Sequence, residues 1–405
     1  MCAFPSEPRP QGSVIASTTN RETGHALNFV PVTIFAESMI PPQAASLNVV
    51  MSRTSQGKAV SIGGREIGPG HPVYIIAEAG VNHCGDIELA KRLIDASVDA
   101  GADAVKFQTY RAERLASREA GKAAYQASAT GIEETQLEML LQLELPADAF
   151  AELARYCEVR GITFLSTPFD EKSVDLLSEL GVPAFKISSG DLTNIPLLRY
   201  LAARQKPVIL STGMANLNEV AEAVACLRNA GCDSIVVLHC VSSYPADPAD
   251  ANLRAMRTLQ ATLHVPVGFS DHTTGPEVAI AAVALGACVI EKHLTTDHNL
   301  PGPDHRSSMI PADFAKFCQA LRVTERALGD GVKRPAAAEH DVRMVARRSL
   351  YTAHDLERGH QLTARDLAAR RPGTGISVAR WDLIIGRRLA RPVAAQVMLR
   401  EEDLA

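Results

Sequence analysis

Several polar side chains lie at the ends of short apolar segments, and their types suit the binding of an anion. Two are cationic, Lys106 and Lys186, and four carry hydroxyl groups, Thr167, Ser189, Ser211 and Ser270. Two ammonium groups with several O–H donors match an anion that combines a phosphate with a carboxylate. We therefore predict a site for such an anion, of which phosphoenolpyruvate is one. Alternatively, one or two of the hydroxyl groups only cap the following helices.

Two histidines, His272 and His293, follow other apolar segments, and each has an acidic residue nearby in the sequence, Asp271 and Glu291 respectively. Imidazole nitrogen suits Mn²⁺, Co²⁺, Zn²⁺ or Fe²⁺ better than Mg²⁺ or Ca²⁺. Two protein ligands leave positions for water and a substrate oxygen, as Lewis-acid catalysis requires. We predict that these two histidines bind a metal ion, whereas His239 also fits simple packing at the end of its segment.

These residues can meet only if the apolar segments are neighbouring parallel strands. The candidate strands span residues 73–77, 104–107, 162–165, 184–187, 208–210, 235–238, 265–269 and 289–290. Helix signals lie between them: Asp86 precedes the helical pattern of 87–100, and Asn216 precedes that of 217–230. Alternating strands and helices in this number predict an α/β fold, a (β/α)8 TIM barrel, whose catalytic residues lie at the carboxyl ends of the strands. No GxGxxG fingerprint follows the first strand, which disfavours a doubly wound sheet.

The composition and periodicity of the sequence change at both ends of this pattern. Residues 1–55 lack sustained periodicity and are expected to be a disordered leader or a misassigned start. Residues 56–330 would form the barrel, and residues 331–343 a linker. Residues 344–405 carry short segments at 349–353, 370–372 and 389–390, separated by turns, which predict a small, mostly β domain.

Composition excludes several classes of protein. The formal net charge is -5, with 41 Lys and Arg against 46 Asp and Glu. Because these charges are spread along the chain, the sequence has no basic stripe that would indicate nucleic-acid binding. No apolar run is long enough to cross a membrane. The 8 cysteines include no CxxC pair, which favours a reducing, cytoplasmic location. We expect small-molecule partners, with no nucleic acid and no membrane.

From Val73 onward the motifs resemble those of the sialic acid synthase family, which includes N-acetylneuraminate and legionaminate synthases. The stretches that carry the resemblance are 76–83 (IAEAGVNH), 106–109 (KFQT), 164–170 (FLSTPFD), 186–191 (KISSGD), 210–214 (LSTGM), 268–273 (GFSDHT), 291–293 (EKH) and 302–305 (GPDH). The end of the chain, with 347–350 (RRSL) and 371–376 (RPGTGI), resembles the antifreeze-like (SAF) domain appended to these enzymes.

The resemblance implies a role for each candidate residue. Phosphoenolpyruvate would be bound by Lys106, Thr167, Lys186, Ser189, Ser211 and Ser270, and the metal by His272 and His293. Gln108, Tyr244 and Asp304 would face the amino sugar, and Glu78, Lys106, Lys186 and Glu291 would act in catalysis. The resemblance also implies a domain-swapped homodimer in which Arg371 contacts the sugar bound in the partner's barrel.

The expected activity is that of a transferase of class EC 2.5.1. It would condense phosphoenolpyruvate with an N-acetylmannosamine-like amino sugar to a nine-carbon sialic acid of the N-acetylneuraminate or legionaminate type, releasing phosphate by C–O cleavage. The metal would most readily be Mn²⁺, with Co²⁺ or Mg²⁺ as alternatives, and which of Glu78 and Glu291 activates the water stays open. Alternative functions are another phosphoenolpyruvate-dependent 3-deoxy-ulosonic acid synthase, the 9-phosphate-forming sialic acid synthase, or a non-catalytic sugar-binding or ice-binding protein. Six arginines in the C-terminal segment argue against ice binding: Arg347, Arg348, Arg370, Arg371, Arg387 and Arg388.

Overall fold

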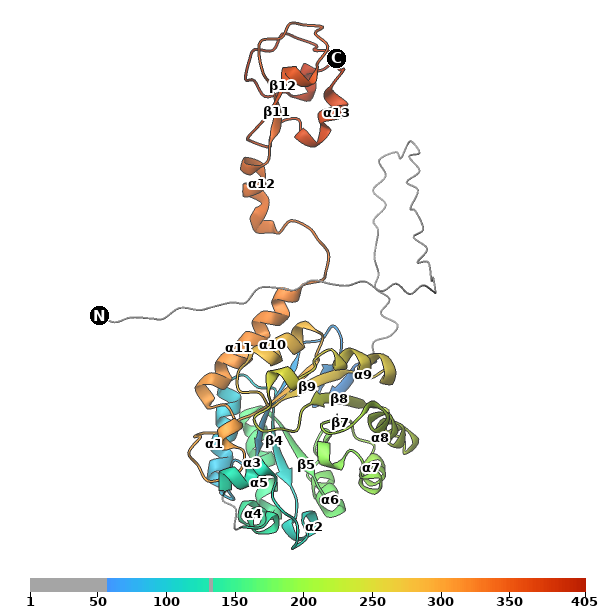
Figure 1. Cartoon of the computed structure of the whole chain (residues 1–405), viewed down its shortest axis with the longest axis vertical. Helices are drawn as coiled ribbons and strands as arrows, with labels where there is room; N and C mark the ends of the chain where they lie inside the picture. The colour runs from blue at the N-terminus through green and yellow to red at the C-terminus, as the bar shows by residue number, and fades with distance from the viewer. Residues whose placement is uncertain (1–56, 131–133) are drawn as a thin grey trace, which may run out of the picture. The chain divides into compact units, whose positions relative to one another are not determined.

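The computed structural model describes residues 57–130 and 134–405 (Figure 1). The expected leader, residues 1–55, lies outside the described residues. Eight parallel strands form one sheet in the order β5-β4-β3-β10-β9-β8-β7-β6. The strands are β3 (Tyr74–Gly80), β4 (Ala104–Thr109), β5 (Thr163–Pro168), β6 (Phe185–Ile187), β7 (Val208–Ser211), β8 (Ile235–Cys240), β9 (Val267–Asp271) and β10 (Val289–His293). The end strands β5 and β6 also contact each other, which gives a nearly closed barrel and confirms the predicted fold.

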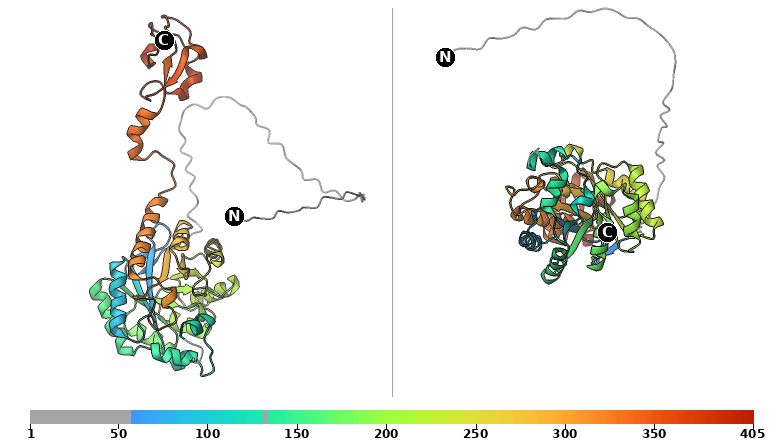
Figure 2. Two further views of the ribbon diagram at one scale, coloured as in Figure 1. Left: turned by 60° about the vertical axis from the view of Figure 1, so that its left-hand side comes forward. Right: turned by 90° about the horizontal axis from the view of Figure 1, so that it is seen from below.

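Helices cover the outside of the strands in all views (Figures 1 and 2). They are α1 (Ile87–Asp99), α5 (Ala147–Arg160), α6 (Glu171–Glu179), α7 (Ile195–Ala202), α8 (Leu217–Asn229), α9 (Ala255–Leu263), α10 (Glu277–Ala284) and α11 (Pro311–Leu328). The predicted caps are confirmed, since the Asp86 side chain accepts from Glu88 N and Asn216 forms a capping box with Glu219. Helix α1 buries Leu89, Leu93 and neighbours on one face, which directs that face toward the sheet.

Side-chain alternation along each strand divides the barrel core into two layers. Outward-facing residues such as Val105 and Val237 pack against the helices, whereas inward-facing residues such as Ile76 and Ile209 fill the barrel interior. A short antiparallel hairpin of β1 (Val60–Ile62) and β2 (Arg65–Ile67) also belongs to the interior cluster. The hairpin was not predicted, although Gly63 and Gly64 between two alternating segments indicate one, and both glycines have positive φ.

Three further helices lie between β4 and α5: α2 (Ala112–Leu115), α3 (Ala124–Thr130) and α4 (Gln136–Leu143). Helices α2 and α4 build a separate apolar cluster with residues that follow β3 and β4; the cluster includes Val81, Tyr110 and Leu143. Short 3-10 turns complete the described chain: η2 (Ser189–Asp191), η3 (Pro248–Asp250), η4 (His305–Ser307), η5 (Ala337–Glu339), η6 (Ala364–Asp366), η7 (Val378–Arg380) and η8 (Glu401–Asp403).

The C-terminal part has an apolar core of its own, which includes Leu350, Leu367 and Leu399. Its elements are α12 (His340–Ala346), β11 (Ser349–Thr352), β12 (Leu367–Arg370) and α13 (Trp381–Ile384), and β11 pairs antiparallel with β12. A small domain with β structure was therefore correctly expected. The second strand begins earlier than predicted, and residue 389 forms an isolated bridge to residue 404 rather than a strand. No described helix has the length and apolar character needed to cross a bilayer.

Candidate active site

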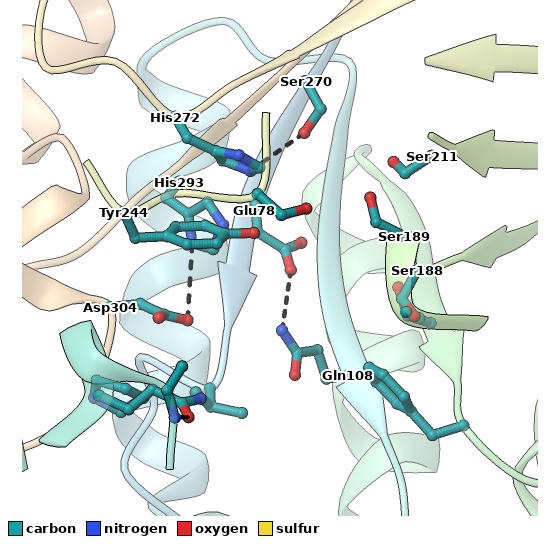
Figure 3. A pocket seen from close by; sticks show the side chains of 18 of the residues that line it. Glu78, Gln108, Ser188, Ser189, Ser211, Tyr244, Ser270, His272, His293 and Asp304 are labelled. Carbon is teal, nitrogen blue, oxygen red and sulfur yellow. Dashed lines mark hydrogen bonds and ion pairs between the residues drawn. The ribbon is translucent and has the colours of Figure 1, made fainter. Parts of the chain in front are cut away.

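A cavity of about 430 Å³ lies at the carboxyl ends of the barrel strands. Its lining includes every residue to which the motif resemblance gives a role, except Arg371. In the view of Figure 3, Ser188, Ser189 and Ser211 lie on one side of the cavity, and His272 and His293 on the other. The strands therefore bring the expected anion-binding and metal-binding groups into one cavity, whose size is in the range of small-molecule sites.

Two lysines and two glutamates form the charged floor of the cavity. Lys106 Nζ lies 2.6 Å from Glu78 Oε2 and 3.8 Å from Glu291 Oε1. Lys186 Nζ lies 3.5 Å from the same Glu291 oxygen. All four side chains are at most 5% exposed. Burying four charged groups costs free energy, so the network is weak evidence for a contribution to stability. It supports instead a site that binds a charged ligand.

The two glutamates differ in their surroundings. Burial raises the pKa of Glu78 to about 7, although Lys106 opposes the shift. Burial acts in the same direction on Glu291, but Lys106 and Lys186 together lower the pKa of Glu291 below its ordinary value. Two carboxyl groups whose pKa values are pushed apart are typical of a division between proton transfer and charge stabilisation.

A bulge at the end of β3 orients Glu78. The register of β3 with β4 shifts between Glu78 and Gly80, and Gly80 adopts a φ of 53°. Residues with a Cβ rarely take this conformation, so glycine permits the bulge. Gln108 Nε2 donates to Glu78 Oε1 at 3.4 Å, as Figure 3 shows.

The hydroxyl groups lie beside the lysines. Lys106 Nζ donates to Thr167 Oγ1 at 3.3 Å, and Ser270 Oγ donates to Glu291 Oε1 at 3.1 Å. Gly213 N donates to Ser189 Oγ at 2.9 Å, a close approach that a side chain at residue 213 would obstruct. Ser211 Oγ is buried and has no hydrogen-bond partner among the residues that the structure describes. An unpartnered buried hydroxyl in an anion-type site is an available donor for a ligand.

The two candidate metal ligands present imidazole groups to the cavity. The His272 and His293 ring centroids are 5.5 Å apart. His272 Nδ1 contacts Val241 O at 2.6 Å, which leaves Nε2 toward the cavity near Ser270. His293 Nδ1 is buried, and no hydrogen-bond partner for it lies within residues 57–130 and 134–405. Burial lowers the pKa of both histidines, which favours the neutral, metal-binding form.

These observations fit a cation held by two histidines. Within residues 57–130 and 134–405 no group of three or more His, Cys, Asp or Glu side chains could hold an ion. Any metal in this cavity would therefore have few protein ligands. His239 is not among the residues that line the cavity; its Nε2 atom contacts Ala251 O at 2.8 Å, which supports the packing interpretation.

Aromatic side chains border the histidines. The Tyr244 ring lies 4.2 Å from the His272 ring and 4.9 Å from the Tyr125 ring, measured between centroids. Asp304 Oδ2 lies 4.0 Å from His293 Nδ1, and burial raises the pKa of Asp304 to about 6. Tyr244 and Asp304 were named from the sequence, whereas Tyr125 was missed.

Helices α2–α4 add a wall that sequence reasoning did not find. Its apolar members in the cavity lining are Leu115, Met139, Leu140 and Leu143, and its polar members are Tyr125, Gln126 and Gln136. The interval between the second and third predicted strands, longer than the others, was the available signal. Arg371 belongs to the C-terminal domain, directly after β12, where it is exposed.

Comparison with known proteins identifies the family of the chain. The NeuB family profile matches residues 93–333, and the SAF domain profile matches residues 347–405. The chain belongs to the NeuB family. The family and the appended SAF domain expected from the motifs are thus confirmed.

Individual relatives of this NeuB family chain are synthases. The chain is 45% identical over 329 residues to N,N'-diacetyllegionaminic acid synthase of Campylobacter jejuni, covering 81% of this chain and 98% of the relative. It is 39% identical over 271 residues to the human N-acetylneuraminate-9-phosphate synthase. The match covers 67% of this chain and 75% of the relative. A solved structure of N-acetylneuraminic acid synthetase from Leptospira borgpetersenii, in complex with citrate, matches with a TM-score of 0.64 and 37% identity, covering 71% of this chain and 95% of that one.

Proposed function

We propose that the protein condenses phosphoenolpyruvate with an N-acetylmannosamine-like amino sugar to form a nine-carbon sialic acid of the N-acetylneuraminate or legionaminate type. Carbon C3 of phosphoenolpyruvate would bond to the sugar aldehyde carbon, water would add at C2, and phosphate would leave with cleavage of its C–O bond. The observation that carries this proposal is that one cavity joins Lys106 and Lys186 to His272 and His293. The names of the relatives support the same chemistry.

The lysines and hydroxyl groups would bind phosphoenolpyruvate. Lys106 and Lys186 would face its two anionic groups, and the Thr167, Ser189, Ser211 and Ser270 hydroxyls would donate to them. As phosphate leaves, the buried ammonium groups offset its charge in surroundings of low polarity. Since Glu291 lies between the two lysines, it would stay ionised and stabilise the cationic character that develops at C2.

Glu78 would accept the proton of the attacking water. Its raised pKa lies close to neutral pH, and a general base is most effective when its pKa is near the pH of the reaction. Lys106, 2.6 Å from one oxygen, and Gln108, near the other, would hold the carboxylate in place. Tyr244, Gln108 and Asp304 would orient the sugar.

His272 and His293 would hold a divalent cation, which we propose to be Mn²⁺, with Co²⁺ or Mg²⁺ as alternatives. When bound, the cation would supply Lewis-acid polarisation of the aldehyde oxygen. Burial favours the neutral form of both imidazoles, and the neutral form is the one that binds a cation.

The wall of α2–α4 favours an acceptor without a phosphate. Within the part of the chain that the structure describes, Lys106 and Lys186 supply the ammonium groups of the lining, and both contact glutamates. The wall itself offers methyl, amide and phenol groups. This supports the N-acetylneuraminate or legionaminate type over formation of a 9-phosphate, because N-acyl and apolar groups match such a surface.

The remaining proposals concern the assembly. We propose a domain-swapped homodimer in which Arg371 contacts the sugar in the partner subunit, and a cytoplasmic location. We also propose residues 56–330 as the barrel domain, 331–343 as the linker and 344–405 as the SAF domain. An assay of phosphate release from phosphoenolpyruvate, with and without amino sugars and with and without chelator, tests the reaction. Release that is independent of any amino sugar would contradict it.

A further inference from the structure

Two charged residues of the strand motifs have no part in the cavity. Asp271 in β9 and Lys292 in β10 are register partners in the parallel sheet. Their sequence neighbours line the cavity: Ser270, His272, Glu291 and His293. Because side chains alternate along a strand, Asp271 and Lys292 point to the opposite face, where Lys292 Nζ lies 6.0 Å from the Phe317 ring centroid.

The pair is the centre of a hydrogen-bond network. Lys292 Nζ donates to Asp271 Oδ2 at 2.8 Å, to Gly275 O at 3.2 Å, and to Thr273 O. Asp271 Oδ1 accepts from Thr273 N at 2.9 Å and from Thr273 Oγ1 at 2.7 Å. All three ammonium protons therefore have acceptors, and the segment that follows His272 is tied to the strand that carries His293.

Stability alone does not account for this pair. The two side chains are at most 1% exposed in a layer that is otherwise largely apolar. Replacing a buried ion pair with well-packed apolar residues often leaves the stability of a protein unchanged or increases it. The network does, however, fix the backbone on both sides of His272 and directly before His293. The His272 ring itself is held at Nδ1 by Val241 O, 2.6 Å away, and Nε2 lies 3.4 Å from Ser270 Oγ.

We propose that Asp271 and Lys292 are positioning residues that hold His272 and His293 at the separation needed to bind one divalent cation. The inference rests on the metal site of the proposed function. It gives Asp271 and Lys292 a role that direct contact with substrate cannot explain, because both side chains face away from the cavity. Outer partners that orient metal ligands typically change metal affinity when they are removed.

The test uses the full chain with Asp271→Asn and Lys292→Met combined, so that no unpaired charge is left in the interior. Asn retains an acceptor for Thr273 N, and Met retains the aliphatic length. Mn²⁺ binding is measured by electron paramagnetic resonance on protein whose fold and melting temperature are checked by circular dichroism. We expect affinity for Mn²⁺ to fall about 10- to 100-fold, with the Kd for phosphoenolpyruvate nearly unchanged.

The control is Asp103→Asn with Arg322→Met, which removes a different, partly buried ion pair with a 2.6 Å contact outside the cavity lining. This control should bind Mn²⁺ as the wild type does. Wild-type Mn²⁺ affinity in the folded Asp271/Lys292 double variant overturns the inference.

If that double variant does not fold, Thr273→Val, which removes a single side-chain hydrogen bond to Asp271, carries the test. A several-fold loss of Mn²⁺ affinity supports the inference, and an unchanged affinity overturns it. Absence of Mn²⁺ binding by the wild type also overturns it, whereas sugar-dependent phosphate release by the wild type tests the condensation separately.

Discussion

Lys106 Nζ lies 2.6 Å from Glu78 Oε2, and both side chains are buried in the barrel mouth. The ammonium group stabilises the carboxylate, yet burial still raises the pKa of Glu78 to about 7. A carboxyl group in this range changes its protonation near neutral pH. This pairing makes Glu78 the residue whose state should control turnover.

We expect turnover to fall as the pH drops through about 7, because protonated Glu78 cannot accept a proton from water. Glu78→Gln should lose about 100- to 10,000-fold in kcat, and its residual rate should lack this pH dependence. The pH profiles of kcat for the two proteins, measured with saturating substrates, check both points. An unchanged acidic limb in Glu78→Gln would assign the titration to another group.

His272→Ala and His293→Ala should each lower turnover by about 1,000-fold, because a Lewis acid supplies several kcal/mol of charge stabilisation. Both variants should keep the wild-type fold, since these side chains face the cavity. Chelation of the wild type should abolish activity, and Mn²⁺ or Co²⁺ should restore it. His239→Asn is the comparison, because it alters a histidine outside the cavity lining and should retain turnover. Full activity of the wild type after exhaustive chelation would contradict the metal assignment.

Arg371→Ala should raise the KM for the amino sugar and spare the KM for phosphoenolpyruvate, because Arg371 is proposed to contact only the sugar. Arg358→Ala, at another exposed position of the same domain, should change neither constant. If Arg371 only forms surface ion pairs, worth about 0 to 1 kcal/mol, its removal will leave the kinetics unaltered.

The proposed exchange of domains predicts complementation between two defective chains. Mixing Lys106→Ala protein with Arg371→Ala protein should, after subunit exchange, restore roughly one quarter of all sites. In each mixed dimer one site combines an intact barrel with an intact arginine. Absence of recovered phosphate release, in a sample where subunit exchange has been verified, would argue against the swapped assembly.

Leu115→Lys should shift the sugar preference toward a phosphorylated acceptor. Leu115 lies in the wall of α2–α4, so a lysine there would supply a cation. A partly exposed charge pair contributes about 1 kcal/mol, which corresponds to roughly fivefold in relative kcat/KM. Competition between an amino sugar and its 6-phosphate measures this ratio, and Leu115→Met controls for the change in shape. If the ratio is the same for Leu115→Lys and Leu115→Met, the wall of α2–α4 does not contact the phosphate end of the acceptor.

The sequence by itself determined the barrel and most of the residues that gather at the candidate cavity. Short β-branched segments alternating with capped amphipathic helices were sufficient for the fold, because hydrophobic period and caps are local properties. The carboxyl ends of barrel strands converge, so the strand pattern alone was enough to assign Lys106, His272 and Glu291 to one cavity. The motif resemblance supplied the family and the SAF domain.

Only the tertiary structure decided which of these residues touch. It placed Glu291 between two lysines and Glu78 beside one of them, which sets the opposite pKa shifts of the two glutamates. It also brought the α2–α4 wall to the cavity and turned Asp271 and Lys292 away from it. The pKa shifts depend on strand register and burial, which arise from contacts between residues far apart in the chain and therefore have no local signal in the sequence. The long interval between the second and third strands indicated an insertion, but only tertiary contacts decided that it lines the cavity.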